Sequence, residues 1–377
     1  MTGGQVSDTT ETSNDGGTGR AKASEEGRKP RKKRANAKRG DLERPELEAV
    51  VCDYFCHQGL TAPEIQKSVR KEFGIRITRE EAYRFVRKAA RSGWITYTPP
   101  QDYALHRGIK EQRYPWLQGV SVVETGNCEG VASRGAQMLM ELLQQHYAGK
   151  EVHVGFSGGY GLRKLAMAFS RMLREPTERL PERIVFHAMV AGFDVDEPTT
   201  DPNAFFAYFV QDPAMQVETS FVGLHAPAMA RPGLLEELTD LPGIREAYQR
   251  SHEINVIVSG ASCWSDDHSP LRRYLDVAGE PLGALGEAGC VGDFLWQPVG
   301  TEGPLEMDTA LKAMTLKQLD EVGTFVEEKN HVLLVAGPCS QCHHPKTEVV
   351  NAILNQDRQL ITHLAIDSRC ARDLLAL

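Results

Sequence analysis

Short apolar runs in the second half of the chain alternate with segments of helical periodicity. Strands are expected at 152–154, 184–190, 217–224, 254–258, 291–294, 331–335 and 363–366. Helices are expected at 132–147, from Leu162 onward, and at 203–209, 234–249, 346–355 and 368–375. Runs that are apolar throughout and that alternate with helices predict an α/β fold, with a mostly parallel sheet covered by helices on both faces.

Residues 41–99 follow a different pattern, that of three short amphipathic helices and a final extended piece at 93–97. The second and third helices open with capping boxes at 61–64 and 78–81. The third has an apolar side and a basic side, which is typical of the last helix of a helix-turn-helix domain, although a solvated surface would look the same. Side chains expected to contact DNA phosphates and base edges are Arg79, Tyr83, Arg84, Arg87 and Lys88.

Charge separates the two halves of this chain of 377 residues. Residues 1–99 hold 20 Lys and Arg against 14 Asp and Glu, whereas the whole chain has a net charge of −8. A basic front end on an acidic body indicates that only the front end meets a polyanion. The expected organisation is a disordered basic tail at 1–40, an all-α DNA-binding domain at 41–99, a linker at 100–119 and an effector and oligomerisation domain at 120–377.

The eight cysteines are dispersed, and no apolar run approaches the roughly 20 residues that span a bilayer. The N-terminus has no apolar signal core. We therefore expect a cytoplasmic protein with reduced thiols and no membrane partner.

A glycine-dense stretch, from Gly155 to Gly161, joins the strand at 152–154 to the helix that follows. A strand, a glycine turn and a helix can present backbone N–H groups to an anion. The spacing matches neither GxGxxG nor the NTP-binding loop, so a plain tight turn is the alternative. Two further strands end in small residues, Ser259-Gly260 and Ala336-Gly337. Because ligands bind beyond the carboxyl ends of parallel strands, the three turns are expected to converge on one crevice.

Several short motifs occur in the order found in one known family. The stretch at 224–229 is similar to L-P-A-P-x-x, the stretch at 290–293 to A-V-G-D, and the tail at 364–375 to L-x-T-D-x-x-x-A-x-x-L-L. P-G-I-R-E stands at 242–246, and V-A-G at 335–337 precedes K-T-E-V-V at 346–350. From Val120 onward the chain resembles the SorC family of sugar-responsive transcription regulators, and residues 41–99 resemble the helix-turn-helix in front of it.

The resemblance implies a sugar-phosphate isomerase/CoA-transferase type of fold, no catalysis and no cofactor. It also implies a phosphorylated sugar as effector, a homo-tetramer, and double-stranded operator DNA as partner. Carried over by position, Asn203 would line the sugar, Asp293 would accept hydroxyl hydrogen bonds and Lys346 would meet an anionic group. The alternatives without a role in binding are that Asp293 caps a turn and that Lys346 is a solvated lysine of the first helical turn. The full set of expected effector-binding residues is Ser157, Gly158, Gly159, Gly161, Asn203, Ser259, Gly260, Asp293 and Lys346.

Two departures from the family bear on the ligand. Gly161 stands where the family usually has Thr or Ser, so a hydroxyl donor is lost. Cys339-Ser-Gln-Cys342-His343-His344 is inserted before Lys346. Cys339, Cys342 and His343 are candidate metal ligands, and a fourth could come from Cys263, His268 or Cys290. A redox-sensing thiol pair and a polar loop are the alternatives, whereas haem attachment is excluded by the missing export signal.

Two rival functions remain open. An isomerase or deaminase could use Asp266, Asp267, His268 and Asp293 as acid and base groups, but the attached DNA-binding domain argues against an enzyme. A metal or redox sensor would take its input at the inserted cysteines, and Cys342→Ser would then abolish its response.

Overall fold

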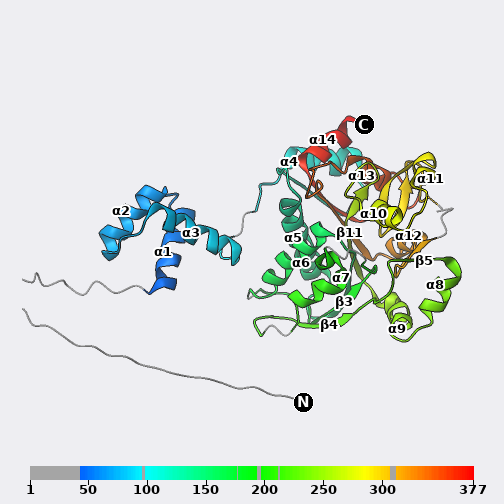
Figure 1. The fold of residues 1–377 in the computed structure, drawn as a ribbon, viewed down its shortest axis with the longest axis horizontal. Coiled ribbons are helices and arrows are strands. Elements are labelled where there is room, and N and C mark those ends of the chain that lie inside the picture. Colours follow the sequence, from blue (N-terminus) through cyan, green and yellow to red (C-terminus); the bar gives the residue numbers. More distant parts are fainter. Residues whose placement is uncertain (1–42, 96–97, 176, 193–196, 211–212, 306–310) are drawn as a thin grey trace, which may run out of the picture. The chain divides into compact units, whose positions relative to one another are not determined.

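The chain divides into two compact units, residues 1–96 and 97–377. The computed structural model describes residues 43–95, 98–175, 177–192, 197–210, 213–305 and 311–377 (Figure 1). The predicted basic tail at 1–40 lies outside the described residues.

The first unit consists of the three expected helices, α1 (Arg44–Cys56), α2 (Ala62–Phe73) and α3 (Arg79–Arg91). Both predicted capping boxes are present. Buried apolar side chains from all three helices form one core, which includes Val51, Ile65, Val69 and Phe85. The expected extended piece after α3 is wrong for Gly93 to Ile95, because these residues continue from the helix into a turn and a bend.

The second unit is built on a seven-stranded sheet whose neighbouring strands are all parallel. The strand order is β1-β12-β11-β6-β2-β3-β4. Strands β6 and β11 are buried along their whole length, and β1, β2, β3 and β12 are buried at every residue but the first, as the continuous apolar runs predict. Their bounds are β1 (Gly119–Val123), β2 (Glu151–Phe156), β3 (Arg183–Ala188), β4 (Glu218–Val222), β6 (Val256–Ser259), β11 (His331–Ala336) and β12 (His363–Asp367).

Helices cover both faces of this sheet, which confirms the predicted fold class (Figure 1). One side carries α5 (Cys128–His146), α6 (Tyr160–Met172) and α7 (Pro202–Phe205). The other carries α12 (Leu319–Glu327) and α13 (Thr347–Leu354), whereas α10 (Pro270–Val277) packs in a separate apolar cluster beside the small sheets. The remaining α-helices are α8 (Pro232–Thr239), α9 (Ile244–Gln249), α11 (Leu282–Glu287) and α14 (Ser368–Ala376).

Two small antiparallel sheets accompany the main one. One holds β7 (Ala261–Cys263), β8 (Cys290–Phe294) and β9 (Gln297–Gly300); the other pairs β5 (Met229–Ala230) with β10 (Lys312–Ala313). The extended run expected at 291–294 therefore forms, but outside the parallel sheet.

The chain changes direction across the sheet between β2 and β6, which are neighbours. The crossover after β2 leads through α6 to β3 on one side, whereas β6 is followed by β11 on the other. Right-handed crossovers in opposite directions leave from opposite faces, so a crevice opens beyond the carboxyl ends of these two strands.

Several element bounds differ from the sequence prediction; α5, for example, begins at Cys128, four residues earlier than expected. Gly155 is inside β2 rather than in the turn, and glycine suits this strand position because Met189 packs where a Cβ would stand. Helix α6 begins at Tyr160, two residues earlier than expected. The single helix predicted at 234–249 is two helices, α8 and α9, since Gly243 between them takes a positive φ of 87°.

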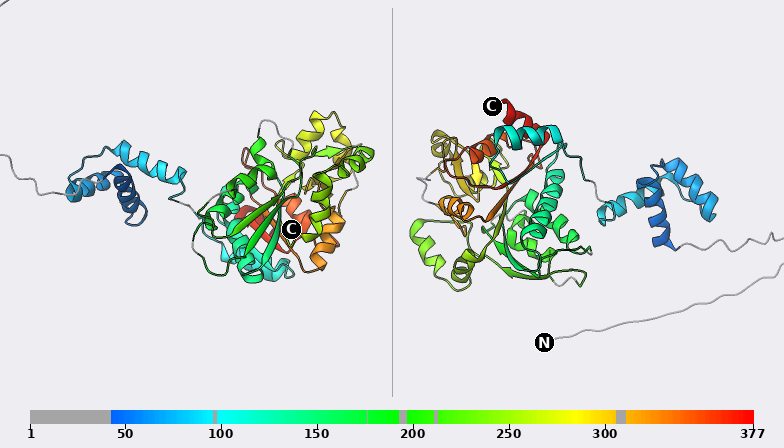
Figure 2. Two further views of the ribbon diagram at one scale, coloured as in Figure 1. Left: turned by 90° about the horizontal axis from the view of Figure 1, so that it is seen from below. Right: turned by 180° about the vertical axis from the view of Figure 1, so that it is seen from behind.

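Most of the segment expected to be a linker is folded onto the second unit. It holds α4 (Tyr103–Arg107) and a π-helical turn (Gly108–Arg113), and both views show α4 beside α14 (Figures 1 and 2). Ile109, Tyr114 and Leu117 are buried in the core of that unit. Among the described residues, no helix has both the length and the apolar character needed to cross a membrane.

Candidate functional site

A cavity of about 420 Å³ opens beyond the carboxyl ends of β2, β6 and β11. Its wall brings together seven of the nine residues expected to bind an effector: Ser157, Gly158, Gly159, Gly161, Gly260, Asp293 and Lys346. Gly337, at the end of β11, lies in the same wall. The three strand ends therefore do converge on one hollow, which we call the effector cavity.

The floor of the effector cavity is fixed by a hydrogen bond between two serine hydroxyls. The Oγ atoms of Ser157, after β2, and Ser259, at the end of β6, lie 3.0 Å apart. The N–H of Ser157 also donates to the carbonyl oxygen of Val258 at 3.0 Å. Ser259 does not itself line the cavity; it supports Ser157 from below.

Helix α6 begins at the cavity without a side-chain cap. Gly159 has a positive φ of 118°, and its N–H donates to the carbonyl oxygen of Thr200 at 2.9 Å. The next N–H groups, in the first turn of α6, have no partner within the helix, as at every helix start. This turn therefore offers backbone donors and the positive end of the helix dipole to an anion.

The glycine at position 161 leaves room beside these donors. A Cβ built on Gly161 would meet nothing within 4 Å. The space that a Thr or Ser side chain would begin to fill at this position is therefore open, and no neighbouring side chain occupies it.

Lys346 and Asp293 are two of the charged residues that line the cavity, together with Glu197, Asp266 and Arg273. Lys346 directly precedes α13 and forms no ion pair with any described residue. Asp293 lies on β8, where burial raises its pKa to about 6, against the lowering effect of the Ser262 hydroxyl and the Lys346 ammonium group. Near neutral pH this carboxyl group can accept hydrogen bonds and, in its protonated fraction, donate one.

Asn203 is not part of the cavity wall. Its amide oxygen accepts from the N–H of Leu224 at 3.0 Å, and its amide nitrogen donates to Asp201 at 2.9 Å and to the carbonyl oxygen of Leu224 at 3.0 Å. These bonds occupy the side chain in joining the start of α7 to the end of β4. The expected sugar contact of Asn203 stays a prediction, and in this conformation the neighbouring Thr200 and Pro202 line the cavity instead.

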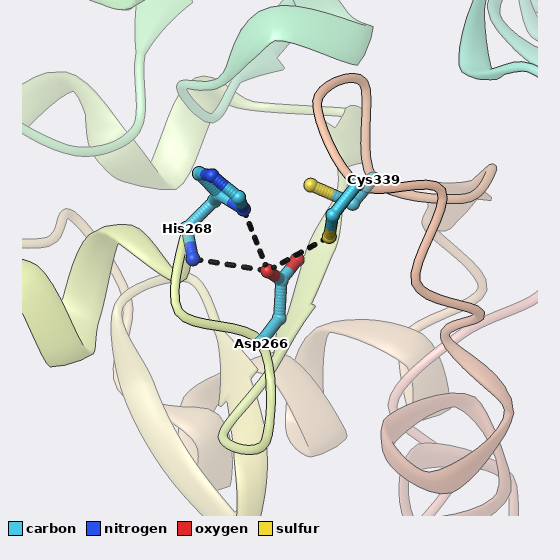
Figure 3. Close-up of side chains that lie close together, drawn as sticks. Asp266, His268 and Cys339 are labelled. Carbon is cyan, nitrogen blue, oxygen red and sulfur yellow. Dashed lines mark hydrogen bonds and ion pairs between the residues drawn. The ribbon is translucent and has the colours of Figure 1, made fainter.

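Four potential metal ligands meet at the rim of the same cavity: Asp266, His268, Cys339 and Cys342. Figure 3 shows His268 and Cys339 converging on the Asp266 carboxylate. Asp266 is buried, which by itself raises its pKa; hydrogen bonds from the His268 N–H, the two thiols and the His268 ring outweigh this and hold the pKa below its usual range. We call these four residues the Asp-His-Cys-Cys group.

The group overlaps only in part with the candidate ligands expected from the sequence, and metal binding stays a prediction. His268, one of the suggested fourth ligands, is in the group, but His343 is exposed and outside it. Cys263 and Cys290 are buried elsewhere, on β7 and β8. Asp266 was not among the expected candidates, although it lies two residues before His268 in the sequence.

Asp267, one of the acids considered for an enzyme, points elsewhere. It is exposed and forms an ion pair with Arg272 at 3.0 Å. Asp266, His268 and Asp293 do line the cavity.

In the first unit, the basic side of α3 is exposed. Two of the five residues expected to contact DNA form ion pairs within the unit. Lys88 Nζ lies 2.7 Å from the carboxylate of Glu48, which is buried on α1, and Arg84 lies 3.3 Å from Glu81. Arg79 stacks over the ring of Tyr83 at 5.6 Å. Arg87 is exposed and has no ion pair among the described residues.

No model of a known protein family matches the chain, and no curated protein matches it. Solved structures do. The full-length sorbitol operon regulator SorC of Klebsiella pneumoniae is similar with a TM-score of 0.59 at 15% identity, covering 89% of this chain and 100% of that one. A DeoR family transcriptional regulator of Listeria monocytogenes gives 0.52 at 18% identity, over 72% and 98% of the two chains. A transcriptional regulator of Streptococcus pneumoniae gives 0.53 at 15%, over 73% and 96%.

The chain therefore has the fold of SorC-type transcription regulators, as the motifs implied. At these identities the likeness concerns the fold alone.

Proposed function

We propose that this protein is a DNA-binding transcription regulator whose second unit senses a phosphorylated sugar and catalyses no reaction. The observation that carries the proposal is the effector cavity, in which an uncapped helix start, a lysine with no ion pair among the described residues and a half-buried carboxyl group line one hollow. Its volume of about 420 Å³ is within the usual range of small-molecule sites.

The polar groups of the cavity match the parts of a sugar phosphate. The first turn of α6 supplies N–H donors and Lys346 supplies a mobile cation, and both favour a phosphate. Asp293 and Ser157 suit sugar hydroxyls, because each can accept and donate. The name of the sorbitol operon regulator, whose fold is similar, is consistent with a sugar or sugar alcohol as the source of the effector, without indicating a phosphate.

The first unit supports the regulatory part of the proposal. Its three capped helices present Arg79, Tyr83 and Arg87 on one exposed side of α3, as a helix-turn-helix domain presents its reading helix. The effector would act by favouring one of two arrangements of the protein, with a coupling free energy of about 1–3 kcal/mol. The homo-tetramer and the cytoplasmic location remain predictions; sedimentation of the full chain would check the first.

The experiment is a titration of DNA binding in the presence of candidate effectors. An operator duplex is first selected from a random pool on the full-length protein, and its binding is then followed by fluorescence anisotropy. We expect one or a few pentose or hexose phosphates to change the Kd for DNA by about 5–150-fold, the usual range of coupling. The unphosphorylated sugars and inorganic phosphate alone should have a much smaller effect.

Two results would contradict the proposal. One is a Kd for DNA that no sugar phosphate changes. The other is recovery of the effective sugar phosphate as a different compound after incubation with the protein, which would favour an isomerase or deaminase.

A further inference from the structure

The loop between β11 and α13 carries a thiol pair in a compact turn. The N–H of Cys339 donates to the carbonyl oxygen of His344 at 2.9 Å, and the N–H of His343 donates to the carbonyl oxygen of Cys339 at 3.0 Å. His343 takes a positive φ of 57°, which lets the chain close on itself. The turn thus holds Cys339 and Cys342 on one small loop rather than in an extended segment.

A second loop, between β7 and α10, meets this turn. Asp266 accepts hydrogen bonds from the His268 N–H at 2.9 Å and from the Cys342 thiol at 3.4 Å, and its oxygen lies 3.1 Å from His268 Nδ1. A further contact joins the same two loops, because Ser265 Oγ lies 3.1 Å from His344 Nε2. The chain therefore brings together two loops that lie about 70 residues apart in sequence and fixes them by more than one bond.

The four donor atoms of the Asp-His-Cys-Cys group lie within 4.8 Å of one another. In a tetrahedral zinc site with Zn–S near 2.3 Å and Zn–N near 2.0 Å, neighbouring ligand atoms are about 3.3–3.8 Å apart. Contraction of about 1 Å would complete such a site, and rotation of exposed side chains such as Cys342 can supply it.

We propose that Asp266, His268, Cys339 and Cys342 form a tetrahedral Zn²⁺ site in the wall of the effector cavity. On binding, the two thiols lose their protons to solvent and become thiolate ligands. The hydrogen bonds that now join them to Asp266 are replaced by bonds to the metal. Two thiolates, one imidazole and one carboxylate give zinc the four-coordinate arrangement of structural sites, with Asp266 in the position of the second histidine of a Cys2His2 set.

The position of the site gives it a consequence for the ligand. Asp266, His268 and Cys339 all line the effector cavity, and Lys346 follows Cys342 by four residues. A bound metal would hold together the two loops that form this wall and so fix the position of Lys346, which directly precedes α13. Metal binding itself does not depend on the proposed effector and can be tested without it.

The test uses the reduced, metal-free full-length protein titrated with Co²⁺, which reports ligand type and geometry by its absorption. We expect one equivalent to bind, with the intense visible bands of tetrahedral cobalt and a near-ultraviolet thiolate band, and Zn²⁺ should displace it. Cys342→Ser should lower the affinity by at least about 100-fold, since loss of an outer-shell partner alone costs about 10–100-fold. Cys56→Ser, at another exposed cysteine, should change nothing.

Asp266→Asn and His268→Gln test the other two ligands. Each should weaken binding while leaving the thiolate band in place, and circular dichroism of the metal-free variants should match that of the parent. The proposal fails if Co²⁺ does not bind, if it binds without a thiolate band, or if Asp266→Asn leaves the affinity unchanged. It also fails if the reduced protein ignores metals while mild oxidation joins Cys339 to Cys342, since the pair would then be a redox couple.

Discussion

The hydroxyl oxygens of Ser157 and Ser259 lie 3.0 Å apart and join the ends of β2 and β6. These are the two strands between which the chain changes direction across the sheet. The hydrogen bond therefore lies at the point where a parallel sheet opens a crevice, and it fixes the floor on which Gly158 to Gly161 and Lys346 are arranged.

Gly161→Ser should increase affinity for a phosphorylated ligand. A side chain there meets nothing within 4 Å, so the hydroxyl can join the N–H donors of the first turn of α6. A hydrogen bond to a charged group is worth about 1.5–3 kcal/mol, which predicts a Kd at least about 10-fold lower. Isothermal titration would measure it, with Gly283→Ser, at another open and exposed glycine, as the control. An unchanged or higher Kd would place the phosphate elsewhere.

Arg87→Ala should weaken operator binding and flatten its salt dependence. The side chain is exposed on α3 and has no ion pair to hold it within the unit. Loss of one phosphate contact should reduce the slope of log K against log salt by about 1. Arg107→Ala, an exposed change in the second unit, should leave the slope unchanged. If both variants keep the parent slope, α3 is not the helix that contacts DNA.

Lys88→Met should act on stability rather than on DNA recognition. Its ammonium group lies 2.7 Å from the carboxylate of Glu48, which is only 4% exposed. Removing that partner leaves a buried carboxylate with the more distant Arg44, at 3.8 Å, and should cost about 1–2 kcal/mol. Chemical denaturation of the full chain, followed through the unfolding of residues 43–95, would measure this loss of stability. The control variant Arg87→Met should not lower the free energy of unfolding. A smaller loss for Lys88→Met than for Arg87→Met would mean that the ion pair contributes nothing.

Stability of the second unit should fall as the pH drops below about 6.5. Burial, helped by neighbouring histidines, lowers the pKa of His331 to about 4 and that of His363 to about 3. Between these values and 6.5 the unfolded chain binds protons that the folded chain does not, so the free energy of unfolding decreases with falling pH. His187 adds to this decrease, because burial lowers its pKa to about 3 as well. Asp293, whose pKa burial raises to about 6, and Asp367, whose pKa burial also raises, have the opposite effect over the lower part of this range, against the three histidines.

Urea denaturation at intervals between pH 4.5 and 7 would measure this slope. His363→Gln should make the dependence of stability on pH shallower, because it removes one of the buried histidines whose pKa is lowered. A stability that does not change with pH, or a slope that the substitution leaves as it was, would contradict the assignment.

The sequence was sufficient for the sheet and for the capped helices because these depend on local patterns. Runs such as 331–335 are apolar throughout, and Thr78 with Glu81 caps α3 as its spacing predicts. The prediction placed Gly155 in a turn, whereas it is a strand residue packed against Met189. It also missed the break between α8 and α9, where Gly243 takes a positive φ. Neither is visible in hydrophobic periodicity.

The candidate site was predictable where residues follow a strand end, as Ser157 and Gly260 do. It was not predictable where a contact joins distant segments. The sequence does not show that the Asn203 amide is hydrogen-bonded to the backbone of Leu224. It also does not show that the ammonium group of Lys88 forms an ion pair with Glu48. Asp266 joined Cys339 and Cys342 only through the meeting of two loops.

The most direct test of the central claim is calorimetric titration of the full-length protein with a panel of sugar phosphates, repeated on Lys346→Gln and on Lys150→Gln. Lys150 is an exposed lysine at the opposite end of β2, and its substitution should leave binding unchanged. We expect at least one sugar phosphate to bind the parent with one site per chain and to lose about 10-fold or more in affinity with Lys346→Gln, as expected for a lost charge-assisted hydrogen bond. If no sugar phosphate binds, or if Lys346→Gln and Lys150→Gln have the same effect, the cavity is not a sensor of phosphorylated sugars.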